Sequence, residues 1–285
     1  MSIIKLSVVI PSRNRPGALI KCLTALNKER HLIYEIIVGD DSSPLYYDSY
    51  QKIKDRFKVK LIRGKKKGLY VNHNLLYKTA QGSHVRTIDD DHIIPLNHIY
   101  KTLSFIKLDK KSIWTIGEKL PLRPSMQDKG FYPGELNSKG YSEHLKDMDN
   151  CIAIGCGSTI YPIEIFKVQK AFYIEKYIFG SIWLEFGPRL KMLGNNIRVI
   201  PNTFVNHYYN ESKRSFNIKK LDDETRLFLI FFYNLIYKKN TKNILSGIYQ
   251  IIKYLLLGKC KNRLKILYSA YKNFINLNVN SFWKN

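Results

Sequence analysis

Acidic residues are scarce in this sequence. Its 285 residues include only 23 Asp and Glu against 47 Lys and Arg, which gives a formal net charge of +24. From residue 225 to the end there is no acidic residue at all. A surface with this excess of positive charge attracts nucleic acid, anionic lipid or phosphorylated small molecules. The charge alone does not choose among these three classes of partner.

Cysteine is also rare, and long apolar runs are missing. The four cysteines, which include no CxxC pair, are Cys22, Cys151, Cys156 and Cys260. This spacing argues against a cysteine-based zinc site or a disulfide framework, and it fits a reducing compartment. The most apolar stretches, 227–237 and 244–258, contain polar residues. Both fall short of the roughly 20 apolar residues that cross a bilayer.

No N-terminal targeting segment is recognised, because Lys5 interrupts the start of the chain and a strand-like run follows it. Apolar residues make up 45% of the chain and aromatic residues 13%, enough for a packed core. We therefore expect a folded, cytoplasmic protein with no transmembrane helix. Its length suits one large domain, or one domain with an appendage.

The first half of the chain alternates strand and helix patterns. Strands are predicted over residues 6–10, 34–43, 58–62 and 84–88, and helices over 18–26 and 72–80. This rhythm predicts an α/β fold with a mostly parallel sheet and helices on both faces. Polar clusters follow three strands: PSRN, GDDSS and DDDH. Because ligands bind beyond the carboxyl ends of such strands, we expect these clusters to meet at one edge.

The second half is less regular. Residues 110–150 are rich in Pro, Gly and charge, and we expect long loops there. Further predictions are a strand over 152–160, a helix over 177–194 and a strand over 197–207. In the basic C-terminal region two amphipathic helices are predicted. One apolar face would carry Ile248, Ile251, Ile252, Leu255 and Leu256, and the other Leu264, Leu267, Tyr271 and Phe274.

Three consecutive aspartates follow the fourth predicted strand. Side chains alternate at a strand end, so Asp89 and Asp91 can share one side while Asp90 faces the other. Two carboxylates on one side repel each other unless a cation neutralises them. A hard divalent ion completed by substrate phosphates is the usual solution. The alternative is a solvated acidic turn.

Four motifs follow one another along the first part of the chain: LSVVIPSRNR, IIVGDDSS, GLYVNHNLLYKTAQG and IDDDHIIP. In this order and at this spacing, they resemble those of the family 2 glycosyltransferases. The resemblance covers most of residues 5–210 and implies the GT-A fold, in which the DxD motif holds a metal ion and the diphosphate of a sugar donor. His73 departs from the pattern, because the family usually has Arg at that position.

The resemblance implies a set of site residues. Those that would contact the nucleotide are Pro11, Arg13, Asp41, His73, Asn74, Asp89 and Asp90. Those that would hold a divalent cation, Mn²⁺ or Mg²⁺, are Asp89, Asp91 and His207. The register of the triplet also permits Asp90 in place of one of its neighbours. For His207 the alternative is a packed or hydrogen-bonded histidine with no metal.

The resemblance also implies a general base that accepts the proton of the acceptor hydroxyl. The corresponding stretch is IWLEFGPRL, residues 182–190, in which Glu185 falls on an acidic position of the family pattern. The usual Glu-Asp pair is replaced by Ile182 and Trp183. A purely structural role for Glu185 is the alternative, and Glu175 and Asp147 are the next candidates for the base.

These observations predict a catalytic domain over residues 1–212, with a nucleotide-binding half over about 1–95 and an acceptor half over about 96–212. Residues 213–285 would form the basic helical extension. The predicted activity is a metal-dependent, inverting glycosyltransferase in surface polysaccharide biosynthesis. Its donor would be a nucleoside-diphosphate sugar, and its acceptor a hydroxyl of a glycan, expected to be lipid-linked.

The basic extension would lie on the anionic inner face of the membrane, with part of it packed on the core. A simply solvated helical face and a nucleic-acid surface are the alternatives for this region. For the whole chain, the alternatives are a nucleic-acid-binding protein or metal-dependent nuclease, and a membrane-associated relative without activity. No recognised nucleic-acid-binding module is present, so nucleic acid is the less favoured partner.

Overall fold

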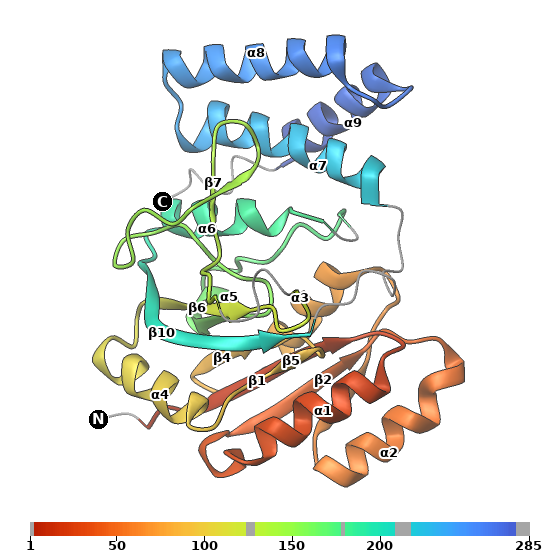
Figure 1. Cartoon of the computed structure of the whole chain (residues 1–285), viewed down its shortest axis with the longest axis vertical. Coiled ribbons are helices and arrows are strands. Elements are labelled where there is room, and N and C mark those ends of the chain that lie inside the picture. Colours follow the sequence, from red (N-terminus) through yellow and green to blue (C-terminus); the bar gives the residue numbers. More distant parts are fainter. Residues whose placement is uncertain (1–2, 124–128, 178–179, 209–217, 278–285) are drawn as a thin grey trace.

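The computed structural model describes residues 3–123, 129–177, 180–208 and 218–277. An eight-stranded sheet forms its centre, in the order β3-β2-β1-β4-β9-β6-β10-β5 (Figure 1). The strands are β1 (Leu6–Ser12), β2 (Glu35–Asp40), β3 (Lys60–Arg63), β4 (His84–Thr87), β5 (His92–Ile93), β6 (Ile113–Lys119), β9 (Thr159–Pro162) and β10 (Ile197–His207). A separate two-stranded ribbon joins β7 (Glu135–Leu136) to β8 (Ser142–Glu143).

The first four strands form a parallel half-sheet, as predicted. β1 lies between β2 and β4 and runs parallel to both, and β3 continues the set. Val8 and Ile10 of β1 point into one hydrophobic core, and Val9 between them points into the other. Both faces of this strand are covered, so its sequence is apolar throughout and does not alternate. β9 is antiparallel to β4 and β6, which makes the complete sheet mixed but mostly parallel.

Helices cover both faces of the sheet, with α1 and α2 on one side and α6 on the other (Figure 1). The helices that pack on the first face are α1 (Pro16–Asn27), α2 (Tyr47–Phe57) and α4 (His98–Leu108). Those on the second face are α3 (Leu69–Thr79), α5 (Glu164–Lys167) and α6 (Trp183–Met192). Short 3₁₀ turns occur at η1 (Arg30–Leu32) and η2 (Pro44–Tyr46).

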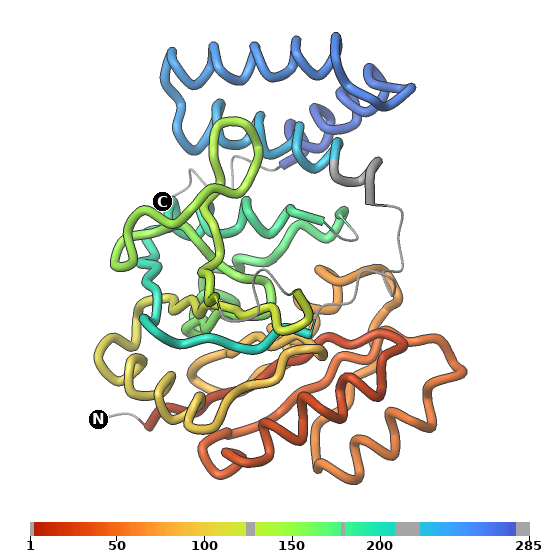
Figure 2. Tube along the Cα trace, in the orientation of Figure 1, coloured from red at the N-terminus to blue at the C-terminus, as the bar shows by residue number. Residues whose placement is uncertain are grey.

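In the described part of the C-terminal region, three α-helices stack beyond α6, on the side away from α1 and α2 (Figure 2). They are α7 (Ile218–Phe232), followed by the π-helical turn η4 (Tyr233–Tyr237), then α8 (Thr241–Leu257) and α9 (Arg263–Ile275). α7 shares the hydrophobic core of α6, and the ring of Phe228 lies 5.4 Å from that of Tyr177. The predicted domain boundary between residues 212 and 213 lies outside the described residues. Within the described part, no helix has the length and apolar content to cross a membrane.

The structure corrects three predictions in the second half. Residues 110–150 are not only loops, because they contain β6, a strand in the middle of the sheet's second half. The strand expected over 152–160 begins only at Thr159, and the helix expected over 177–194 begins only at Trp183. The two strands depend on partners far away in sequence: β6 is bonded to β9 and β10, and β9 also to β4.

Candidate active site

Three strand ends meet at Ser12, the last residue of β1. Its backbone carbonyl accepts a hydrogen bond from the Asp41 amide at 2.9 Å, and its hydroxyl donates to Asp90 Oδ2 at 2.6 Å. A second link joins the same two loops, because the Asn14 amide donates to Ser42 Oγ at 2.7 Å. The polar clusters that follow β1, β2 and β4 therefore lie side by side at the carboxyl edge of the sheet.

Asp90 points into the protein, toward α1. Besides Ser12 it contacts Arg15, whose Nη2 lies 2.5 Å from Asp90 Oδ1. Burial raises the pKa of Asp90 to about 7, although the charge of Arg15 acts in the opposite direction. Arg15 also donates to Asp91 Oδ2 at 2.7 Å. One guanidinium thus bridges two of the three aspartates and offsets part of their mutual repulsion.

The other two aspartates join a pair of histidines. Asp89, Asp91, His92 and His207 each offer an atom to a cluster in which these atoms lie within 4.8 Å of one another. β5 pairs with β10 in antiparallel register, and this pairing places His92 opposite His207. Nε2 of His207 is 3.4 Å from Asp91 Oδ1, and Nε2 of His92 is 3.8 Å from Asp89 Oδ2. The cluster is therefore built by strands that lie far apart in sequence.

Glu118 orients His207 from behind. Nδ1 of His207 lies 2.9 Å from Glu118 Oε2, which leaves Nε2 directed at Asp91. Burial acts to raise the pKa of Glu118, but the hydrogen bond and charge of the histidines lower it to about 2. Burial acts to lower the pKa of His207, but Glu118 and the aspartates raise it to about 9. A carboxylate behind a histidine is a common way to fix a metal-binding imidazole.

These residues fit a divalent cation. Both ring nitrogens of His92 are buried and have no hydrogen-bond partner among the described residues. Burying them without a partner is energetically unfavourable, and coordination of a ligand atom would remove this penalty. Carboxylates suit Mg²⁺ and Mn²⁺, and imidazole favours the transition metal of the two. Gly157 lies against the cluster, since a Cβ at that position would sit 2.4 Å from Asp89 Cγ. Only a glycine leaves Asp89 in this position.

The carboxylates of Asp40 and Asp41, at the end of β2, fix the neighbouring loop. Asp41, which is buried, accepts a hydrogen bond from the Lys66 amide at 2.7 Å. Asp40 forms an ion pair with Arg63, and the Arg63 guanidinium lies 3.5 Å from the centre of the Tyr47 ring. Together these contacts hold the loop that follows β3 beside the strand ends. This places an aromatic ring and a guanidinium next to the edge that carries Asp41.

The remaining predicted nucleotide residues lie in different surroundings. Pro11 is buried in β1 opposite Gly39, and Arg13 is partly exposed in the loop after β1. His73 is fully buried, with Nε2 3.3 Å from Cys156 Sγ, and burial lowers its pKa to about 4. Asn74 exchanges two hydrogen bonds with the backbone of Tyr173, at 2.9 and 3.0 Å. Asn74 thus attaches the segment before α6 to α3.

Glu185, the predicted base, is 1% exposed in the first turn of α6. Both of its carboxylate oxygens accept hydrogen bonds from Arg189, at 2.6 and 3.0 Å. Glu185 is thus buried and ion-paired, and its catalytic role stays a prediction. Glu175 accepts a bond from Asn74 at 3.1 Å, and Asp147 accepts two from its own loop.

Three residues of the site were not singled out from the sequence: Arg15, His92 and Glu118. His92 directly follows the aspartate triplet, so the motif contained a signal for it. Arg15 follows the PSRN cluster by one residue, which was a weaker signal. Glu118 had none, because it belongs to β6, in a segment predicted to be loops.

Solved structures with the same fold bind nucleotides and sugars. Residues 1–349 of S. aureus TarS in complex with UDP-GlcNAc match with a TM-score of 0.65 and 17% identity, over 96% of this chain and 81% of that one. GalNAc-T7 with UDP, GalNAc and Mn²⁺ matches with a TM-score of 0.67 and 16% identity, over 97% of this chain and 58% of that one. Against the longer TarS structure this chain spans 54% of the length, with a TM-score of 0.58 and 14% identity over 98% of this chain. No curated protein matches at the sequence level.

The fold is therefore the GT-A type predicted from the motifs. A sequence profile agrees with this fold independently of the structural matches. The profile of Glycosyl transferase family 2 matches residues 7–152, which is half of the chain and contains the four motifs quoted above except for Leu6. The protein belongs to glycosyl transferase family 2.

Proposed function

We propose that this protein transfers a sugar, with inversion, from a nucleoside-diphosphate sugar to a hydroxyl of a glycan. The cluster of Asp89, Asp91, His92 and His207, beside the strand ends linked through Ser12, carries the proposal. Structures of the same fold that contain UDP-GlcNAc, or UDP with Mn²⁺, support a uridine nucleotide as the first donor to test.

The residues of the cluster would place the donor diphosphate at the edge of the sheet. A divalent ion bound there would neutralise the charge that develops on the departing nucleoside diphosphate. Glu118 keeps His207 oriented, and Ser12 with Arg15 holds Asp90 away from the cluster. Asp41 would accept a hydrogen bond from the base of the nucleotide. The chain thus supplies position and charge, while the acceptor hydroxyl supplies the nucleophile.

Binding of UDP in the presence and absence of Mn²⁺, measured by calorimetry, tests this proposal. We expect UDP to bind the wild-type chain more tightly when Mn²⁺ is present. Asp91→Asn removes a charged ligand of the ion. We expect the factor by which Mn²⁺ tightens UDP binding to fall about tenfold or more in this variant. Asp48→Asn, an exposed aspartate in α2, is the matched control. Metal-independent binding, or equal loss in both variants, would contradict the assignment.

Glu185 is the proposed base, and its test separates catalysis from structure. If Glu185 accepts the proton of the acceptor, Glu185→Gln lowers kcat by about 10²-fold to 10⁴-fold and leaves UDP binding unchanged. The same substitution leaves Arg189 partly unpaired, so thermal stability is measured in parallel. Glu164→Gln, on the surface at α5, is the control. If Glu185→Gln loses stability but keeps full turnover, Glu185 has a structural role, and Glu175 becomes the next candidate for the base.

The proposed acceptor is a lipid-linked glycan of a surface polysaccharide, reached from an anionic membrane. Large apolar side chains of α8 and α9 are exposed, among them Leu256 at 71% and Leu264 at 73%. Exposed lysines, including Lys253 and Lys265, lie on the same two helices. Helices that combine apolar and cationic surfaces suit a lipid interface. Membership of the family favours this hypothesis over a nuclease, which the same positive charge would also accommodate.

A further inference from the structure

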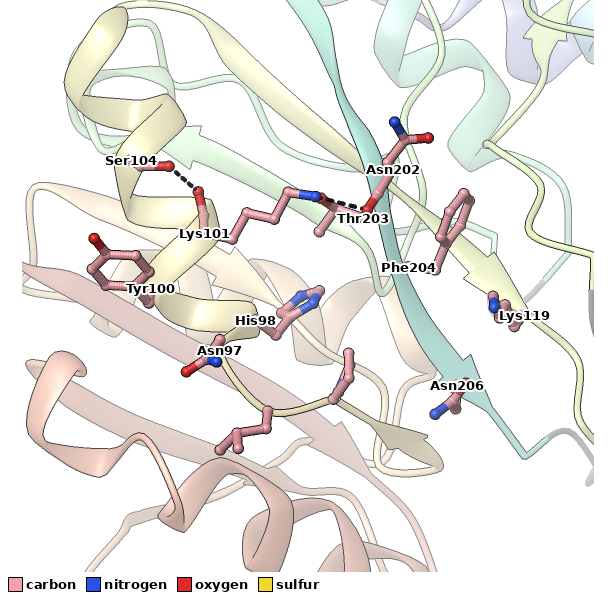
Figure 3. A pocket seen from close by; sticks show the side chains of 12 residues that line it. Asn97, His98, Tyr100, Lys101, Ser104, Lys119, Asn202, Thr203, Phe204 and Asn206 are labelled. Atoms are coloured by element: carbon pink, nitrogen blue, oxygen red, sulfur yellow. Dashed lines mark hydrogen bonds between the residues drawn. The ribbon is translucent and has the colours of Figure 1, made fainter.

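A pocket that shares no residue with the aspartate cluster lies between α4 and β10 (Figure 3). Its volume of about 820 Å³ is within the range of small-molecule sites. Side chains alternate along a strand: His207 of β10 faces the aspartates, and Asn206 before it lines the pocket. In β6, Glu118 and Lys119 alternate in the same way. The side chains of Asn206 and Lys119 therefore point away from those of His207 and Glu118, and no residue of the aspartate cluster lines the pocket.

The lining of this pocket is cationic. None of its lining residues is acidic, and two of them, Lys101 and Lys119, are lysines. Nζ of Lys101 donates to the backbone carbonyl of Asn202 at 2.7 Å, which holds the lysine between α4 and β10 (Figure 3). Nζ of Lys119 lies 5.8 Å from the centre of the Phe204 ring. Two ammonium groups with no carboxylate beside them in the lining favour an anionic ligand.

His98 gives a second and independent indication of a ligand. Its side chain lines the pocket, is only 2% exposed, and points from α4 toward β10 (Figure 3). Neither ring nitrogen has a hydrogen-bond partner among the described residues. A buried polar group without a partner costs about 1–3 kcal/mol, and a hydroxyl or oxyanion of a ligand would remove this cost.

The N-terminus of α4 is not itself the anion site. The carboxylate of Glu29 already accepts hydrogen bonds from the amides of Ile99 and Tyr100, at 3.3 and 3.0 Å. An anionic ligand would therefore depend on the lysines and His98. The rings of Tyr100 and Phe204 also line the pocket and offer flat apolar surfaces beside these polar groups. A sugar presents such a combination, with hydroxyl groups at its rim and C–H groups on its faces.

We propose that this pocket binds an anionic saccharide, a sugar that carries a phosphate or a carboxylate group, at a site separate from that of the nucleotide donor. Lys101 and Lys119 would bind the acidic group, and His98 would bind a hydroxyl. The ring of Phe204 would pack against the face of the sugar. Binding does not require the aspartate cluster, so the proposal goes beyond the transfer reaction and does not depend on it.

Calorimetric titration of the full chain tests this proposal, with glucose 6-phosphate, glucuronic acid, glucose and inorganic phosphate as probes. We expect at least one acidic sugar to bind about tenfold or more tightly than either glucose or inorganic phosphate. The phosphate and carboxylate probes identify which acidic group is preferred. Saturating UDP with Mn²⁺ should leave this binding unchanged, because the pocket and the aspartate cluster share no residue.

Variants locate the site. Lys119→Ala should weaken the acidic sugar about tenfold, as should His98→Gln where it folds. Lys107→Ala, an exposed lysine of α4 outside the pocket, should have no effect. The proposal is overturned if neither acidic sugar binds, if inorganic phosphate binds as tightly, if Lys107→Ala matches Lys119→Ala, or if UDP displaces the sugar. Retained sugar binding in a chain that fails to bind UDP would overturn the transferase proposal and support this one.

Discussion

The three consecutive aspartates lie in two different environments. Asp90 is buried against Ser12 and Arg15 and joins the loop after β1 to that after β4. Asp89 and Asp91 face the histidines of β5 and β10. Adjacent like charges are tolerated because Arg15 and the nearby Arg86 offset them. Burial lowers the pKa of Arg86 to about 10, against the opposing charges of Glu118 and Asp89.

His73 makes the stability of the protein depend on pH. Burial lowers its pKa to about 4 from an ordinary value of 6.5, so the folded chain resists protonation where the unfolded chain accepts it. Stability must therefore fall as the pH drops from about 6.5 toward 4. Between about pH 7.5 and about pH 4.5 this single group lowers the unfolding free energy by about 2–3 kcal/mol.

Urea unfolding at these two pH values checks the prediction. We expect the loss of unfolding free energy on acidification to be smaller by about 2–3 kcal/mol in His73→Gln than in the wild type. His31→Gln, an exposed histidine, should behave like the wild type. An unchanged acid dependence in His73→Gln would show that its imidazole is not held in the neutral form.

At the level of elements, the segment before β9 is shaped by its glycines. Gly157 lies against Asp89, and a Cβ at Gly155 would sit 1.8 Å from Ser158 Oγ. The apolar residues of this segment predicted a strand, but residues 151–158 follow an irregular path past the cluster. A glycine within a strand-like pattern often lies where another group comes close. Here the group next to Gly157 is the carboxylate of Asp89.

Gly157→Ala should weaken Mn²⁺ binding about tenfold or more, because the new methyl group would displace the carboxylate of Asp89. Mn²⁺ titration followed by electron paramagnetic resonance gives the affinity directly. Gly17→Ala is the matched control: a Cβ there meets nothing within 4 Å. It should leave the affinity unchanged and raise the unfolding free energy by about 0.4–1 kcal/mol. Equal affinities in both variants would show that Asp89 is not a ligand.

The sequence predicts one continuous apolar face on each of the two C-terminal helices, but in the structure only part of each face is buried. Ile251 and Leu255 of α8 pack against the core, whereas Ile252 and Leu256 beside them are 50% and 71% exposed. In α9, Phe274 is 9% exposed and Leu264 is 73% exposed. Each helix thus uses part of its apolar surface to pack on the protein and leaves the rest uncovered. An apolar surface of this kind marks an interaction site when it is contiguous.

At the scale of the whole molecule, the helices that carry the exposed apolar side chains lie at the end opposite the first helices of the chain (Figure 1). α8 and α9 form one end, and α1 and α2 the other. A membrane at the first end would leave the second open to a donor from solution. This arrangement predicts that the protein binds a membrane in one orientation, through α8 and α9. The positive charge of the rest of the chain would contribute little to this binding.

Vesicle sedimentation checks that prediction. The chain should bind vesicles that contain phosphatidylglycerol more tightly than those of phosphatidylcholine alone, and added salt should weaken the binding. Lys253→Gln with Lys265→Gln should lower the affinity roughly 30-fold, at about 1 kcal/mol per lost charge. The control pair, Lys21→Gln with Lys52→Gln in α1 and α2, should not. Equal losses in both pairs would point to unspecific charge attraction.

The sequence by itself determined those features of this protein that depend on residues close together in the chain. Short apolar runs, turn residues and the order of PSRN, GDDSS and DDDH predicted the parallel strands β1 to β4 and their shared edge. These features depend on neighbours in sequence and on a general rule for parallel sheets, so they can be derived from the chain alone. The family profile covers this part of the sequence.

Only the tertiary structure decided the rest. His92 meets His207 because β5 pairs with β10 across more than a hundred residues, and Glu118 reaches His207 because β6 lies beside the same strand. His98 and Lys119 come together for the same reason. Such contacts are set by which strands pair and by the alternation of side chains across the sheet. A local sequence pattern contains neither, because both arise from packing between distant segments.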